Sequence, residues 1–212
     1  MGKWYFIVVN LISNKVDYSI HFLIGIDQDK MIFVDESGFN LHVNRKRGRS
    51  IIGIPATIET TNSRGGNISI CAALSPTEGL IFFKVKAGAF NSDEYVIFLK
   101  SLFKLPQLRR SQHYIIQDNV PFHKTKDVGK VFSKYKHIQK FLPPYSPQLN
   151  PIEFCFSKWK AYIKRNEKSD KTQLIALMEE AAQTITAEDE QGWYREVARY
   201  HDDCAASKEL SC

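Results

Sequence analysis

Three acidic residues stand where the chain is predicted to enter or leave regular structure, and together they could bind divalent metal. Asp35 ends the apolar run 31–35, Asp118 follows the apolar run 113–117, and Glu153 lies in the first turn of a predicted helix. Carboxylates gathered at one place repel one another unless a cation neutralises them, and Mg²⁺ prefers such oxygen ligands. Two ions can activate a water or a 3′ hydroxyl and stabilise the leaving oxygen of a phosphodiester. The residue types therefore indicate phosphodiester chemistry with two Mg²⁺ ions per site, and Mn²⁺ could replace Mg²⁺.

These acids can meet only if the elements that carry them are neighbours in one sheet. Short apolar runs bounded by turn residues predict five strands, which cover 31–35, 67–74, 80–86, 113–117 and 138–142. Capped or amphipathic segments predict helices, which cover 92–105, 125–135, 151–164, 170–185 and 187–201. This order predicts an α/β fold, a five-stranded mixed sheet flanked by helices, and it is the element order of the ribonuclease H-like fold. If the first and fourth strands are adjacent, Asp35 and Asp118 converge at one sheet edge.

Composition places the chain among globular proteins and favours an anionic partner. Of 212 residues, 43% are hydrophobic and 25% charged, which excludes disorder, collagen and coiled coil. Lys and Arg number 29 against 23 Asp and Glu, and the formal charge of +6 mildly favours nucleic acid. We expect a non-catalytic N-terminal appendage over 1–30, a catalytic domain over 31–205 and a tail over 206–212.

Cysteine spacing and hydropathy predict where the protein works. The four cysteines lie far apart without a CxxC pair, which argues against a disulfide framework or a cysteine-rich zinc site. The apolar run 4–12 is too short to span a bilayer and lacks a cleavage pattern. We therefore expect a protein that is neither secreted nor in a membrane, located in the nucleus if the source is eukaryotic and otherwise in the cytoplasm.

Three segments in order resemble the catalytic blocks of mariner-like DDE transposases and related insertion-sequence transposases. They are FVDESGFN (33–40), QDNVPFHK (117–124) and PPYSPQLNPIE (143–153). Thirty-four residues separate Asp118 from Glu153, the gap typical of the branch whose third acid is Glu. The resemblance implies that Asp35, Asp118 and Glu153 are metal-binding catalytic acids. It further implies nicking at transposon ends followed by strand transfer into target DNA, with a homodimer as one expected form.

The same resemblance assigns supporting residues around the acids. Asn119 and His123 match the Asp-Asn-x-x-x-His block, in which they would order the loop at the active site. Tyr145 and Asn150 belong to the block that aims the helix carrying the glutamate. Glu36 directly follows the first aspartate, but side chains alternate along a strand, so we expect it to point away.

Clustered cations predict how the chain would touch DNA. A basic loop and one further lysine could neutralise backbone phosphates without reading bases; these residues are Arg45, Lys46, Arg47, Arg49 and Lys124. A solvated loop explains the same cluster equally well. Members of the family usually carry helix-turn-helix modules ahead of the catalytic domain, and we expect none in 1–30. Binding by this chain should therefore be indifferent to sequence.

Two other functions fit the same residues. A ribonuclease H-type nuclease needs the same fold and acids, and activity on an RNA:DNA hybrid would distinguish it from a transposase. A domesticated or truncated transposase-derived protein could bind DNA or another partner without turnover. The presence of all three acids argues against decay of the site, although it does not prove turnover.

Overall fold

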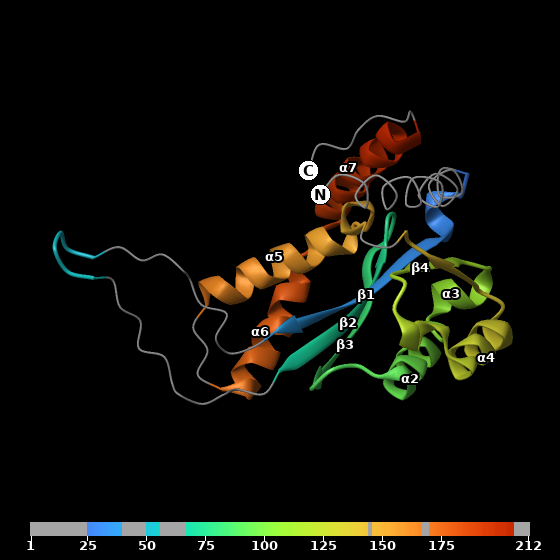
Figure 1. Ribbon diagram of the computed structural model, residues 1–212, viewed down its shortest axis with the longest axis horizontal. Coiled ribbons are helices and arrows are strands. Elements are labelled where there is room, and N and C mark those ends of the chain that lie inside the picture. Colours follow the sequence, from blue (N-terminus) through green and yellow to red (C-terminus); the bar gives the residue numbers. More distant parts are fainter. Residues whose placement is uncertain (1–24, 40–49, 56–66, 144–145, 167–169, 206–212) are drawn as a thin grey trace, which may run out of the picture.

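A computed structural model describes residues 25–39, 50–55, 67–143, 146–166 and 170–205 of the chain. Its centre is a mixed sheet of five strands, ordered β3-β2-β1-β4-β5 (Figure 1). The strands are β1 (Met31–Phe39), β2 (Ile68–Ser75), β3 (Gly79–Ala87), β4 (Tyr114–Gln117) and β5 (Ile138–Phe141). β1, β2 and β3 pair antiparallel, whereas β4 runs parallel to both β1 and β5. The predicted α/β architecture is confirmed, and the first and fourth strands are neighbours, which is the condition for Asp35 and Asp118 to converge.

Helices cover both faces of the sheet (Figure 1). One layer comprises α2 (Ser92–Leu102), α3 (Pro106–Arg110) and α4 (Lys126–Tyr135). The other comprises α5 (Ile152–Arg165), α6 (Lys171–Gln183) and α7 (Ala187–Ala205). Short 3-10 turns lie at η1 (Gln28–Lys30), η2 (Pro121–Lys124) and η3 (Pro147–Leu149).

Alternation along β1 explains how one continuous apolar strand serves two cores. Met31 and Phe33 face the layer of α5, α6 and α7, while Ile32 and Val34 face the layer of α2, α3 and α4. A strand buried on both faces is apolar throughout, which is why this run shows no alternation in sequence. The sheet is thus held rigidly between two cores.

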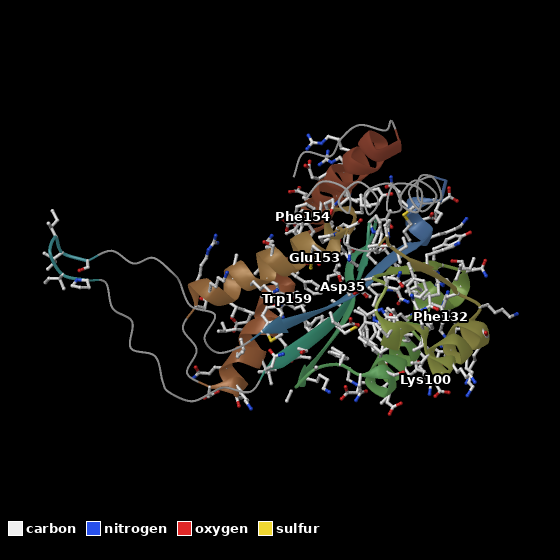
Figure 2. The ribbon with its side chains drawn as sticks, in the orientation of Figure 1. Asp35, Lys100, Phe132, Glu153, Phe154 and Trp159 are labelled. Carbon is white, nitrogen blue, oxygen red and sulfur yellow. The ribbon has the colours of Figure 1, made fainter. Side chains whose placement is uncertain are left out.

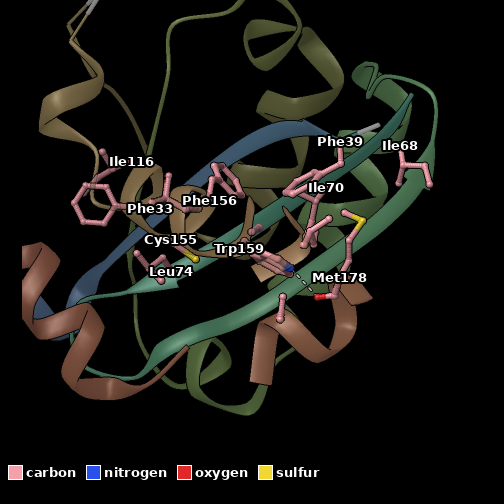
Figure 3. Close-up of a cluster of buried hydrophobic side chains, with 14 of the residues drawn as sticks. Phe33, Phe39, Ile68, Ile70, Leu74, Ile116, Cys155, Phe156, Trp159 and Met178 are labelled. Atoms are coloured by element: carbon pink, nitrogen blue, oxygen red, sulfur yellow. Dashed lines mark hydrogen bonds between the residues drawn. The ribbon is translucent and has the colours of Figure 1, made fainter. Parts of the chain in front are cut away.

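Trp159 anchors the core beneath α5. Its indole Nε1 donates a hydrogen bond to the backbone oxygen of Met178 at 2.7 Å (Figure 3). Its ring meets Phe83 of β3 edge-on, with centroids 5.3 Å apart. A buried tryptophan needs such a partner for its N–H, and these contacts tie α5 to both α6 and the sheet. They also fix the helix that carries the third acid in its first turn.

The structure corrects two element boundaries and adds short elements. β1 continues four residues beyond Asp35, because the polar segment 36–39 pairs with the apolar β2. The helix expected to reach 105 ends at Leu102, and Pro106 begins the separate helix α3, where its missing N–H costs nothing. Two proline-led 3-10 turns, η2 and η3, occupy segments for which no regular structure was predicted.

The ends of the chain are only partly described. Ile26, ahead of η1, packs against the core under α5, α6 and α7. Of the expected appendage 1–30, residues 1–24 lie outside the described residues, as does the expected tail 206–212. Among the helices that are described, none is both long and apolar enough to cross a membrane.

Candidate active site

Parallel pairing brings the first two acids together at the carboxyl edge of the sheet. The last pair between β1 and β4 is Val34 with Gln117. Asp35 and Asp118 each follow a member of that pair, so the two carboxylates leave neighbouring strands at the same level. Asp118 follows the end of β4 as predicted, whereas Asp35 lies inside the longer β1.

The third acid reaches this edge from α5. Glu153 lies in the first turn of the helix. The Glu153 backbone N–H donates a hydrogen bond to the Asn150 carbonyl at 3.2 Å, at the start of that helix. Asp35, Asp118 and Glu153 line one cavity of about 580 Å³, and Figure 2 shows Asp35 on β1 near Glu153 at the start of α5. The three predicted acids therefore share one site.

Asp35 is the most buried of the three, with 8% of its surface exposed. The Asn150 side-chain amide donates to its Oδ2 at 2.9 Å, and the Glu36 backbone N–H donates to its Oδ1 at 2.7 Å. Burial, followed by the charge of the neighbouring Glu36, raises the pKa of Asp35 to about 8. A carboxyl held in this way ionises readily only beside a cation.

The other two acids share this acidic environment. Asp118 Oδ1 is buried, and the group that faces it is His123 Nδ1, an ion-pair partner 3.0 Å away. Burial raises the pKa of Glu153; Lys160 opposes that shift and Asp118 adds to it. This donor set of oxygen atoms, costly to ionise together, fits a hard divalent cation.

A buried histidine lies beneath the acids. His123 of η2 has no exposed side-chain surface, and its Nε2 lies 3.3 Å from Glu36 Oε1. Burial alone would lower its pKa, but hydrogen bonds to Asp118 and Glu36 raise the pKa to about 9. One ligand atom from each of Glu36, Asp118 and His123 lies within 4.8 Å of the others.

Glu36 is the site residue that sequence reasoning missed. Alternation does send its side chain to the face opposite Asp35, where Cys71 Sγ lies 3.3 Å from Oε1. The predicted direction is confirmed, but Glu36 also lines the cavity, which that prediction did not include. The signal lay in the spacing: His123 follows Asp118 by five residues, so a short turn can carry it under the strand end.

The structure describes some of the remaining predicted site residues, and the others lie outside the described residues. Asn119 and Asn150 line the cavity. Lys124 is exposed on η2, with its Nζ 5.1 Å from the centre of the Phe141 ring. Tyr145 and the basic-loop residues lie outside the described residues; the latter are Arg45, Lys46, Arg47 and Arg49.

A family model described as DDE superfamily endonuclease matches residues 30–175. No curated protein matches the chain by sequence. Among solved structures, the Mos1 transposase paired-end complex with left transposon end is similar with a TM-score of 0.76 and 19% identity, covering 92% of this chain and 62% of that one. The Mos1 strand transfer complex gives a TM-score of 0.76 and 19% identity, covering 94% of this chain and 62% of that one.

A structure of the Mos1 transposase catalytic domain with raltegravir and Mn is also similar, with a TM-score of 0.71 and 16% identity. In that case 94% of each chain is covered. This chain thus spans about three fifths of the first two relatives and almost all of a catalytic domain. These matches confirm the predicted ribonuclease H-like fold.

Proposed function

We propose that this chain, which belongs to the DDE superfamily endonucleases, is a transposase catalytic domain that cuts and joins DNA phosphodiesters with divalent metal. The observation that carries the proposal is the convergence of Asp35, Asp118 and Glu153 on one cavity. The resemblance of the three blocks to mariner-like transposases and the similarity of the fold to Mos1 transposase support it.

The three acids would hold the metal. Their fit rests on the donor set, which consists of carboxylate oxygens around one cavity, and on Asp35, whose burial disfavours its charge unless a cation lies beside it. We propose two Mg²⁺ or Mn²⁺ ions per site; Mos1 structures with Mn and with Mg support the choice of ion. When bound, such ions supply charge stabilisation and activation of the attacking oxygen.

The chain's own residues orient this chemistry. Asn150 and the Glu36 backbone N–H fix both oxygens of Asp35, so that carboxylate cannot rotate away from the cavity. Glu153 projects from a helix whose position Trp159 secures. Pre-positioned groups of this kind lower the barrier because no reorganisation is needed during reaction.

DNA is the proposed partner, in the form of transposon ends and target DNA. The matched Mos1 complexes support this proposal, as does the formal charge of +6. We further propose a homodimer as the working assembly, and a location in the nucleus or in the cytoplasm according to the source. Lys124 and the basic loop would contact phosphates.

A cleavage assay on supercoiled plasmid tests the proposal. The unaltered protein should nick duplex DNA with Mg²⁺ or Mn²⁺ and be inactive in EDTA, and the Asp118→Asn protein purified identically should be inactive throughout. Cleavage confined to an RNA:DNA hybrid would instead establish a ribonuclease H-type nuclease. A folded protein that binds metal and cleaves neither substrate would establish a domain without turnover.

A further inference from the structure

Asp118 is held from below by a histidine as well as facing the cavity. His123 Nδ1 lies 3.0 Å from Asp118 Oδ1 and 3.3 Å from the Asp118 backbone oxygen. The opposite ring nitrogen, Nε2, lies 3.3 Å from Glu36 Oε1. The ring therefore connects an acid on β1 to the acid that follows β4, and His123 itself lies 87 positions after Glu36 in sequence.

The surroundings of His123 leave its ring little freedom. The Tyr95 ring lies 4.2 Å away between centroids and the Phe122 ring 4.3 Å away. The Gln139 amide of β5 donates to the His123 backbone oxygen at 2.7 Å. Tyr95 also hydrogen-bonds Gln117, the residue before Asp118. The ring is thus fixed by packing, with Nε2 at the Glu36 carboxylate and Nδ1 close to both the backbone oxygen and Oδ1 of Asp118.

Glu36 is committed to this arrangement on the side away from Asp35. Its Oε1 lies 3.3 Å from both His123 Nε2 and Cys71 Sγ, and its side chain is 17% exposed. A carboxylate engaged by two buried groups is an anchor for the ring. Groups of this kind, one contact removed from a metal ligand, fix its orientation, and their loss typically costs about 10–100-fold in metal affinity or activity.

We infer that Glu36 and His123 act as one unit, the Glu36–His123 pair, which positions Asp118 for the reaction. Glu36 is a positioning residue that acts through His123, and it is not itself a metal ligand. This inference rests on the proposed function, because Asp118 is taken as one of the catalytic acids. Asp35 has its own support in Asn150, so each aspartate is fixed by separate buried side chains.

The test compares Glu36→Ala, His123→Ala, the double variant and Glu36→Gln in the full chain. DNA nicking rates and Mn²⁺ half-saturation are measured, the latter from the rise in Tm as the ion is added. Glu36→Ala and His123→Ala should each lose about 10–100-fold in activity, and the double variant should lose no more than the worse single one. Glu36→Gln keeps an acceptor oxygen for His123 Nε2 and should recover part of the loss.

Glu78→Ala is the matched control, since it removes an exposed glutamate from the β2–β3 turn and should leave both measurements unchanged. Circular dichroism of every variant verifies folding, so a variant that unfolds is replaced by Glu36→Gln with His123→Gln. The ratio between single and double variants then supplies the same comparison.

Three results would overturn the inference. Losses that multiply in the double variant would show two independent roles. Glu36→Gln as damaging as Glu36→Ala, with Mn²⁺ binding weakened as much as in Asp118→Asn, would make Glu36 a ligand. Unchanged nicking and unchanged Mn²⁺ half-saturation in Glu36→Ala would show that Glu36 has no positioning role. If the unaltered protein binds Mn²⁺ but does not cleave, the proposed function fails while Mn²⁺ binding still tests the pair; a protein that does neither overturns both.

Discussion

Buried histidines at the two ends of the parallel strands lie in opposite electrostatic surroundings. At the carboxyl edge, His123 lies between the carboxylates of Glu36 and Asp118, and its pKa is raised to about 9. At the amino edge, His113 and His137 precede β4 and β5, with ring centroids 5.6 Å apart. There burial, assisted by His113, lowers the pKa of His137 to about 4.

The difference shows that the carboxyl edge keeps a buried histidine charged, whereas the amino edge keeps one neutral. Burial favours the neutral imidazole at both ends, and only adjacent carboxylates can reverse that preference. At the amino edge His137 is neutral, and its Nδ1 accepts a hydrogen bond from the His113 backbone N–H at 3.2 Å. The carboxyl edge gathers four acidic side chains around one cavity. A requirement for charge at that edge explains the arrangement, whereas stability alone would not favour it.

Removing any of the three proposed metal-binding acids should have the largest effect. Asp35→Ala, Asp118→Ala and Glu153→Ala should each reduce DNA cleavage to background, because each removes an oxygen donor for the metal. Far-ultraviolet circular dichroism should stay unchanged, and the rise in Tm on adding Mn²⁺ should shrink, since a ligand stabilises only the state that binds it. Retained cleavage in one variant would remove that residue from the catalytic set.

Asn150 sharpens the comparison because it supports Asp35 without bearing charge. Asn150→Ala removes the 2.9 Å hydrogen bond to Asp35 Oδ2 and should lower cleavage by about 10–100-fold. Gln148→Ala is the control: it deletes a neighbouring amide on η3 that does not line the cavity. Nicking rates and Tm should be measured for both. Equal losses would show that the sensitivity belongs to η3 as a whole.

Protonation of His137 at the amino edge should lower the free energy of unfolding in acid. His137 has a folded pKa of about 4 against an ordinary 6.5, so its contribution to stability is complete above pH 6.5 and is lost as pH falls toward 4. The loss should reach up to about 3 kcal/mol, at about 1.4 kcal/mol per pH unit. Urea unfolding across this range should give a flatter pH dependence for His137→Asn, whose side-chain oxygen can still accept from His113.

A pH dependence that is identical in the unaltered and His137→Asn proteins would contradict this assignment. All other ionisable groups are the same in the two proteins. Subtracting the two curves therefore isolates His137.

The two edges also differ in how far sequence could predict them. Asp35, Asp118 and Glu153 were predictable because each adjoins an element with a clear apolar pattern, and parallel pairing brings strand ends together. The continuation of β1 through Gly38 was not, since its polar residues resemble a turn until β2 supplies hydrogen-bond partners. The pairing of His113 with His137 depends on the register between β4 and β5, which no local pattern specifies.

Glu36 lies between these two cases. Strand alternation correctly placed its side chain on the face opposite Asp35, as its contact with Cys71 shows. What alternation could not supply was the position of η2, which brings His123 against that face. Local periodicity thus predicts direction, while tertiary packing decides which group is met there.

The smallest expected effect distinguishes the two edges by their contact with DNA. Lys124 is exposed on η2, whose Pro121 lines the cavity, whereas Lys136 is exposed next to His137 at the amino edge. Each phosphate contact contributes about −0.9 to the slope of log affinity against log salt. Lys124→Gln should therefore flatten the slope by up to about 0.9, and Lys136→Gln, with the same charge change, should not.

Replacing the basic-loop residues with Gln should flatten the slope by up to the equivalent of roughly four phosphate contacts; these residues are Arg45, Lys46, Arg47 and Arg49. Fluorescence anisotropy on two unrelated duplexes across a salt series measures all of this, and neither duplex should be preferred, since phosphate contacts carry no sequence information. Equal flattening by Lys124→Gln and Lys136→Gln would mean that DNA responds to net charge alone, and the carboxyl edge would then have no special claim as the DNA-facing side.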